Sequence, residues 1–243
     1  MQVLDFGDGH TAGVARPRRF ADVAAAVAEL GLDGARRVLV VVGGASGLDE
    51  RGIERLPTLF SQVLVPVARA WNAAVVDGGT DSGVMQLLGQ ALRAVEASFP
   101  LVGVAVDKKV AVPGDTSETG ARRALERHHT HFVLVPGSSW GDESPWLAQV
   151  ATEIAAGAPS VTVLVNGGDI ALQDVANSVA AARPVLVING TGRAADRIAA
   201  ALDGDSSDAQ VAHLADSAMV TAASWPDGAA VRAALEKLAA SQQ

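Results

Sequence analysis

The chain has 243 residues, a formal net charge of −8 at neutral pH and no cysteine. The lack of cysteine excludes disulfides, thiolate nucleophiles and cysteine-ligated zinc. The acidic balance argues against polymeric DNA or RNA as a partner, because such polymers are bound through many contacts between phosphates and Lys or Arg. One or two phosphates of a mononucleotide, in contrast, need only backbone N–H groups and one arginine.

Hydrophobic residues make up 49% of the chain and aromatic residues only 4%, so Ala, Val, Leu and Ile must build the core. Such material suits strands that helices cover on both faces. The length fits a single domain over residues 1–243. The start of the chain lacks a basic region followed by a long apolar run, and no stretch approaches the roughly 20 apolar residues of a membrane span. We therefore expect an unexported, cytoplasmic protein with no membrane partner.

In chain order, the first predicted elements are a strand over residues 1–6, a glycine-containing loop and a helix over about 19–30. An apolar run over 38–42 predicts a buried strand, and it ends in a glycine turn. The residues of this first turn that we expect at a ligand are Gly43, Gly44 and Ser46. The helix that follows has its apolar residues three and four positions apart, and Pro66 should kink or end it.

A second strand and glycine turn follow at residues 74–85. The turn residues that we expect at a ligand are Gly78, Gly79, Thr80, Asp81, Ser82 and Gly83. Glycines at the carboxyl end of a strand let the backbone approach a ligand, and the free N–H groups of the next helix point at any phosphate there. Taken alone, the same pattern also fits a tight connection with no ligand.

A third strand is predicted over 101–106, and a polar loop over 107–124. The next strand includes three close histidines. His129 and His131 would share one side of that strand and His128 would face the other, so the pattern does not complete a metal site. We therefore predict no bound metal and no required cofactor.

A third glycine turn follows this strand. Its residues that we expect at a ligand are Gly137, Ser138, Ser139, Trp140 and Glu143. Asp142 and Glu143 are the candidate acids, because a pair of acids can activate water for glycosidic cleavage. Ser144 and Pro145 also fit an N-cap and first position of a helix, which is a structural role.

Two further strands, over 161–165 and 184–188, end in the fourth and fifth turns, and each turn leads into an alanine-rich helix. The expected ligand-binding residues of these turns are Asn166, Gly167, Gly168, Asp169, Asn189, Gly190, Thr191, Gly192 and Arg193. A surface loop near 204–208, a strand near 219–222 and a helix over about 227–240 complete the predicted elements.

The alternation of strands and helices predicts an α/β fold with a Rossmann-like, doubly wound and mainly parallel sheet that carries helices on both faces. The five turns would then meet at one edge of the sheet, where such folds bind ligands. This convergence predicts a nucleotide or phosphosugar site. Neither the dinucleotide fingerprint nor the P-loop pattern is present.

Three segments, Val76–Met85, His129–Val135 and Pro184–Asp196, resemble the SLOG superfamily in this order. The most similar branch is related to the cytosolic N-terminal region of melastatin-type TRP channels and has stand-alone prokaryotic members. The resemblance covers about residues 37–202. It implies a Rossmann-like domain that binds a nucleotide derivative, and in some channels that ligand is ADP-ribose.

The resemblance also implies roles for single residues. The second turn, from Gly78 to Gly83, matches the one that faces phosphate or ribose, with Asp81 at a plausible ribose position. Arg193 matches an arginine of the channels and would form a charge-assisted bond with phosphate. Trp140 falls where an aromatic residue stacks on a base, whereas Leu147 stands where the channels have another arginine.

The hydrolase branch of the superfamily has a Pro-Gly-Gly-x-Gly-Thr-x-x-Glu pattern. The corresponding run here, residues 166–174, has Ile-Ala in place of Gly-Thr, and its acid is displaced or replaced. The sequence thus favours a sensor that binds ADP-ribose, NAD or a related nucleotide. A hydrolase that cleaves an N-glycosidic or phosphate linkage of a nucleotide is the alternative, and a scaffold or homo-oligomer is a third reading.

Overall fold

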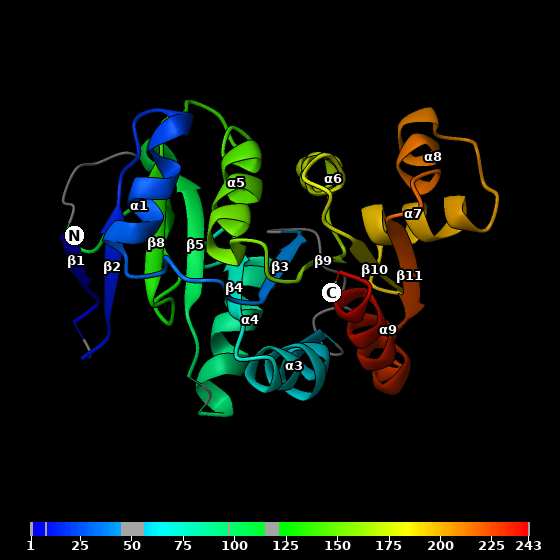
Figure 1. Ribbon diagram of the computed structural model, residues 1–243, viewed down its shortest axis with the longest axis horizontal. Helices are drawn as coiled ribbons and strands as arrows, with labels where there is room; N and C mark the ends of the chain where they lie inside the picture. The colour runs from blue at the N-terminus through cyan, green and yellow to red at the C-terminus, as the bar shows by residue number, and fades with distance from the viewer. Residues whose placement is uncertain (1, 8, 45–55, 97, 115–121, 243) are drawn as a thin grey trace.

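The computed structural model describes residues 2–7, 9–44, 56–96, 98–114 and 122–242. Nine strands form one sheet in the order β1-β2-β8-β5-β4-β3-β9-β10-β11, with helices above and below it (Figure 1). The first two strands form an antiparallel pair, and the other neighbours pair in parallel. The predicted α/β, doubly wound and mainly parallel fold is confirmed.

The strands of this sheet are β1 (Gln2–Asp5), β2 (Thr11–Ala15), β3 (Val38–Gly43), β4 (Ala74–Asp77), β5 (Leu101–Val106), β8 (His131–Val135), β9 (Ser160–Val165), β10 (Val185–Asn189) and β11 (Val220–Ser224). Two short strands, β6 (Val110–Ala111) and β7 (Arg123–Ala124), pair separately. The α-helices are α1 (Val23–Glu29), α3 (Val65–Ala70), α4 (Gly83–Ala94), α5 (Ser144–Ala155), α6 (Asp169–Ala180), α7 (Arg193–Leu202), α8 (Ala209–Ala215) and α9 (Gly228–Ala240).

The core lies on both faces of the sheet because side chains of a strand alternate between its faces. Along β3, Val38, Val40 and Val42 belong to the core cluster to which α1, α5, α6, α7 and α8 contribute. Leu39 and Val41 pack with α3, α4 and α9 on the other face. All five side chains are almost completely buried, as expected for a central parallel strand.

Pro66 was predicted to kink or end its helix, and the structure shows that it does not end it. The chain stays helical over residues 56–70, and a π-helical turn, η2 (Phe60–Leu64), comes directly before α3. Pro66 lacks the N–H that would bond to the Gln62 carbonyl four residues earlier. Arg232 of α9 donates to this carbonyl oxygen instead, at 3.1 Å from its Nη2. A side chain from far along the sequence thus satisfies the acceptor that proline leaves open.

Three other predicted segments contain more regular structure than expected. The glycine-containing loop near the start includes β2, which pairs with β8 and buries Ala12 and Val14. The loop over 107–124 includes a 3-10 turn, η3 (Asp107–Lys109), and the pair β6–β7. The segment that follows residues 204–208 includes α8. Ser46, which was predicted to contact a ligand at the first glycine turn, lies outside the described residues.

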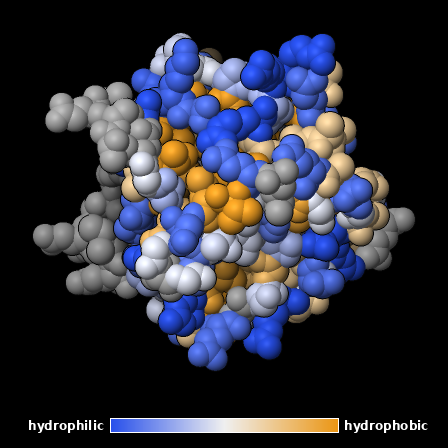
Figure 2. All heavy atoms as spheres, turned by 90° about the vertical axis from the view of Figure 1, so that its left-hand side faces the viewer, coloured by the Kyte–Doolittle hydropathy of each residue, from blue (hydrophilic) through white to orange (hydrophobic). Residues whose placement is uncertain are grey.

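Apolar side chains gather on the face that carries β1 and β2, where hydrophilic residues surround them (Figure 2). Val3 and Phe20 are the most exposed large apolar residues in the part of the chain that the structure describes. Among the described residues, no helix has the length and apolar character needed to cross a bilayer. The expected homo-oligomer stays a prediction.

Candidate functional site

A cavity of about 390 Å³ lies at the carboxyl edge of the sheet, next to β3. The chain passes from β3 to β4 on one side and later returns to β9 on the other, so the strand order switches at β3. Doubly wound sheets bind their ligands at such a switch point. The residues that line the cavity are Val41, Val42, Gly43, Gly44, Gly78, Thr80, Met85, Arg123, Trp140, Glu143, Leu147, Gly168, Asp169, Ile170, Ala171, Asp174 and Arg193.

Each of the five predicted turns contributes to this lining. The turns at β3, β4 and β9 contribute glycines, which carry no side chain, together with Thr80 and Asp169. The turns after β8 and β10 contribute side chains, namely Trp140, Glu143 and Arg193. The structure therefore brings together segments that are far apart in the sequence, and it places their polar groups around one space.

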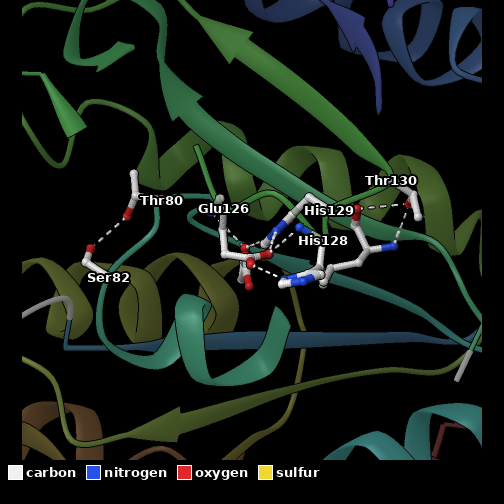
Figure 3. Close-up of polar contacts among 9 residues, drawn as sticks. Thr80, Ser82, Glu126, His128, His129 and Thr130 are labelled. Atoms are coloured by element: carbon white, nitrogen blue, oxygen red, sulfur yellow. Dashed lines mark hydrogen bonds and ion pairs between the residues drawn. The ribbon is translucent and has the colours of Figure 1, made fainter. Parts of the chain in front are cut away.

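The turn after β4 is fixed from several directions. The Gly79 N–H donates to Asp77 Oδ1 at 2.7 Å, and Gly79 has a φ of 66°, which glycine adopts without strain. The Thr80 and Ser82 hydroxyls lie 3.1 Å apart (Figure 3). Asp81 does not line the cavity. Its Oδ1 accepts a hydrogen bond from Gln86 Nε2 at 2.9 Å. The predicted contact between Asp81 and a ribose thus stays a prediction, since Asp81 is not among the residues that line the cavity.

The turns after β9 and β10 are joined to one another. The Asn166 N–H donates to Thr191 Oγ1, and Asn166 Nδ2 donates to the Thr191 carbonyl, each at 2.8 Å. Arg193 lies over Gly168, since its Nη2 is 2.8 Å from the position of a Cβ added to that glycine. Asn166 and Thr191 therefore build the turns, while Gly168 leaves room for the arginine in the cavity.

The turn after β8 separates the two candidate acids. Asp142 Oδ2 accepts the N–H groups of Ser138 and Ser139 at 2.8 and 3.0 Å, and these bonds hold the pKa of Asp142 below its usual value. Asp142 is exposed and does not line the cavity. Burial raises the pKa of Glu143, which does line it. Of the two candidate acids, only Glu143 therefore lies where it could exchange a proton with a ligand in the cavity. Asp142 stabilises the turn through its hydrogen bonds.

Sequence reasoning missed two charged residues of the lining, Asp174 and Arg123. Asp174 lies on α6, and its Oδ1 accepts a bond from Ser144 Oγ at 2.5 Å. Burial, and to a lesser degree the nearby Glu143 carboxylate, raise the pKa of Asp174 to about 7. Asp174 ends the run 166–174 that was compared with the hydrolase pattern, so the signal was present. Arg123 reaches the cavity from β7, a strand that no sequence pattern predicted.

The other predicted ligand-binding residues do not line the cavity as the structure describes it. Several of them form the turns on which the lining residues lie. They are Gly79, Asp81, Ser82, Gly83, Gly137, Ser138, Ser139, Asn166, Gly167, Asn189, Gly190, Thr191 and Gly192. Their contact with a ligand stays a prediction.

The histidine arrangement differs from the prediction. β8 begins at His131, so His128 and His129 precede the strand and do not alternate across it. Both of their rings bond to the Glu126 carboxylate, a nearby acid that the sequence reading had not connected with them. Among the described residues, no three His, Asp or Glu side chains group in a way that would hold a metal ion.

The Asp174→Asn substitution is expected to remove part of the pH dependence of stability. The folded-state pKa of Asp174 is raised to about 7, so the folded protein keeps a proton that the unfolded chain releases near pH 4. The stability from this proton is fully present below about pH 4 and is lost as the pH rises through 7. Because Asp174 is only half-buried, wild type should lose about 1–2 kcal/mol more than the variant between pH 5 and pH 8 in denaturant titrations. If wild type and the variant lost the same free energy of unfolding between pH 5 and pH 8, the raised pKa of Asp174 would be contradicted.

The cavity lining combines two arginines and one tryptophan with three acids, Glu143, Asp169 and Asp174. Arg123 and Arg193 supply positive charge, and Trp140 supplies an aromatic surface for stacking. Glu143 and Asp174 are acids of raised pKa at the same cavity. Such acids can accept hydrogen bonds from ribose hydroxyls or exchange protons with water.

Known proteins resemble this chain over most of its length. Transient receptor potential cation channel subfamily M member 2 of Mus musculus is 28% identical over 204 residues, which cover 70% of this chain and 13% of the channel. A subfamily M member-like 2 channel of Nematostella vectensis is 25% identical over 195 residues, 65% of this chain and 12% of the channel. Subfamily M member 6 of Mus musculus is 27% identical over 174 residues, 60% of this chain and 9% of the channel.

The chain thus spans 13% or less of the length of these channels. The family model described as SLOG in TRPM, prokaryote, matches residues 36–231 and so includes every turn of the cavity. This match confirms the resemblance predicted from the three motifs. The chain belongs to the family that is described as SLOG in TRPM, prokaryote.

Proposed function

We propose that the domain is a sensor that binds a nucleotide derivative, of the ADP-ribose or NAD type, in the cavity beside β3. The observation that carries this proposal is the meeting of five strand-end turns around one cavity that contains Arg193 and Trp140. A volume of about 390 Å³ lies in the range of small-molecule sites. Arg193 would bind phosphate, Trp140 would stack on the base, and the acids would accept bonds from ribose.

A calorimetric titration with ADP-ribose, NAD, AMP and ribose 5-phosphate tests the proposal. We expect ADP-ribose or NAD to bind with a dissociation constant well below 1 mM. Ribose 5-phosphate should bind more weakly because it lacks the base that would stack on Trp140. If none of the four compounds binds better than millimolar, the proposal is wrong.

The Arg193→Ala substitution should weaken this binding by about 10- to 150-fold, or 1.5–3 kcal/mol, because it removes a charge-assisted bond with phosphate. Arg197→Ala is the matched control. Arg197 lies on the same helix, α7, but it pairs with Asp208 and does not line the cavity. Titrations of both variants with the same nucleotide compare the two arginines. Equal affinities in the two variants would remove Arg193 from the site.

A hydrolase is the second candidate, because Glu143 and Asp174 both have raised pKa values at the cavity. In N-glycosidic cleavage, water would add its hydroxyl to C1′ of ribose, the bond from C1′ to the base nitrogen would break, and the base would leave with the proton. One acid would take up the proton of water and the other would donate to the base. Chromatography after incubation with each bound nucleotide, with Glu143→Gln and Asp174→Asn as controls, would reveal products. Intact nucleotide would refute this candidate.

We also propose that the protein acts in the cytoplasm and forms a homo-oligomer. A cytoplasmic compartment is compatible with the lack of cysteine. The exposed apolar side chains of Val3 and Phe20 support self-association. Light scattering of the purified protein measures the oligomeric state. A monomer at all concentrations would refute the proposed homo-oligomer.

A further inference from the structure

A fully buried histidine lies between two carboxylates, next to the turn that follows β4 (Figure 3). His129 Nε2 is 2.8 Å from Asp77 Oδ1, and His129 Nδ1 is 2.8 Å from Glu126 Oε2. Ionised carboxylates only accept hydrogen bonds, so both ring nitrogens must donate. Although burial lowers the pKa of His129, the attraction of Asp77 and then Glu126 raises it to about 9. The ring is therefore an imidazolium at neutral pH.

Further contacts fix each member of this group. Glu126 Oε1 lies 2.6 Å from His128 Nδ1, and Oε2 accepts the His128 N–H at 3.0 Å. The carboxylate lies against Gly89 of α4, where a Cβ would be only 2.1 Å from Oε2. The His129 ring stacks on Phe132 of β8, with 5.3 Å between the ring centroids. The cation thus bonds to both acids, and Glu126 is also held by His128 and lies against α4.

The same two acidic residues hold Gly79 from both sides. Asp77 Oδ1 accepts the Gly79 N–H at 2.7 Å. The Glu126 N–H donates to the Gly79 carbonyl at 2.9 Å. Gly78 and Thr80, on either side of Gly79, line the cavity. His129 itself does not line the cavity, so it acts on the site only through Asp77, Glu126 and Gly79.

Charge explains why this position needs a cation. The group has two carboxylates and one imidazolium, and Asp77 Oδ2 is buried without a hydrogen bond in the part of the chain that the structure describes. Without the imidazolium, the two buried carboxylates would lose the cation that now bonds to both of them. Buried charges without partners are strongly unfavourable. Asp77 would then move away from Glu126, and its bond with Gly79 would change.

We propose that His129 is a positioning residue of the cavity: its imidazolium holds Asp77 and Glu126 so that Gly79 presents the turn in a binding-competent conformation. This proposal rests on the proposed nucleotide function. It adds to that function a residue that touches no ligand and yet controls affinity.

The test compares His129→Gln with His131→Gln. Glutamine at position 129 can bond to one acid but carries no charge. His131 is the matched control: it lies two residues further on, it bonds to Thr130 Oγ1 at 2.8 Å and it belongs to no carboxylate pair among the described residues. In the ligand-free proteins, we expect amide exchange at residues 78–82 to become at least 10-fold faster in His129→Gln only. Exchange in α9 should stay unchanged. ADP-ribose should bind at least 10-fold more weakly to this variant.

A charge-balanced variant separates positioning from general destabilisation. Glu126→Gln combined with His129→Gln removes one negative and one positive charge, and it should restore part of the slow exchange at residues 78–82.

If His129→Gln does not fold, the nitrogen-15 spectrum of wild type decides, because both ring nitrogens of His129 should carry protons at pH 7.5. A neutral ring, or unchanged exchange in folded His129→Gln, would overturn the positioning role. If none of the four compounds named above bound to wild type, the proposed function would be overturned instead.

Discussion

The Gly43→Ala substitution should lower the free energy of unfolding by about 3 kcal/mol or more. A Cβ at this position would lie 2.1 Å from the carbonyl oxygen of Val165. Because this oxygen belongs to the backbone of β9, which pairs with β3 over six residues, no rotamer change can relieve the contact. The two strands would have to separate at the switch point, where Gly43 also lines the cavity. Nucleotide affinity should therefore fall together with stability.

Denaturant titration measures the change, with Gly34→Ala as the matched control. A Cβ at Gly34 would have nothing within 4 Å, and its φ is not in the left-handed region. Gly34→Ala should leave stability unchanged or raise it slightly, since alanine restricts the unfolded chain. Similar stabilities for the two variants would show that the β3–β9 contact adapts, and the prediction would be wrong.

The Gly89→Ala substitution should also destabilise the protein, by about 2–3 kcal/mol, although alanine favours a helix by about 1 kcal/mol over glycine. The added Cβ would lie 2.1 Å from Glu126 Oε2 and 2.2 Å from Glu126 Cδ. A free glutamate would swing away. Here His128 and His129 hold the carboxylate, so its displacement leaves the buried imidazolium with one acid.

A double-mutant cycle with Glu126→Ala tests this cause. Once the glutamate side chain is absent, Gly89→Ala meets no obstacle and should cost nothing further. The double variant should thus be as stable as Glu126→Ala alone, or slightly more stable. If the two single effects simply add, the clash with Glu126 is not the cause.

Sequence patterns predicted most of the sheet because central parallel strands consist mostly of apolar residues. The runs at β3, β5, β9 and β10 are examples. The prediction failed where tertiary contacts override local signals. β2 is a short segment that contains glycine, and its pairing with β8 makes it a strand. Pro66 is tolerated because Arg232, 170 residues away from Gln62, donates to the carbonyl that proline leaves unpaired.

The candidate site was predictable to the extent that it follows from topology. Parallel strands have their carboxyl ends at one edge, so the five turns had to meet there. The contact between His129 and Asp77 could not be predicted, since these residues are 52 positions apart and only the packed sheet brings them together. The same holds for Arg123, which reaches the cavity through a strand of two residues.

Trp140 has a spectroscopic consequence. The chain contains no tyrosine and four tryptophans, so its ultraviolet emission comes from indole rings. Among the described residues, Trp140 is the only tryptophan that lines the cavity. Trp71, in contrast, is buried, and its Nε1 donates to Glu236 Oε1 at 3.0 Å. A base stacked on Trp140 would quench its emission and leave that of Trp71 unaltered. Titrations can therefore follow occupancy without a label, and Trp140→Phe supplies the blank.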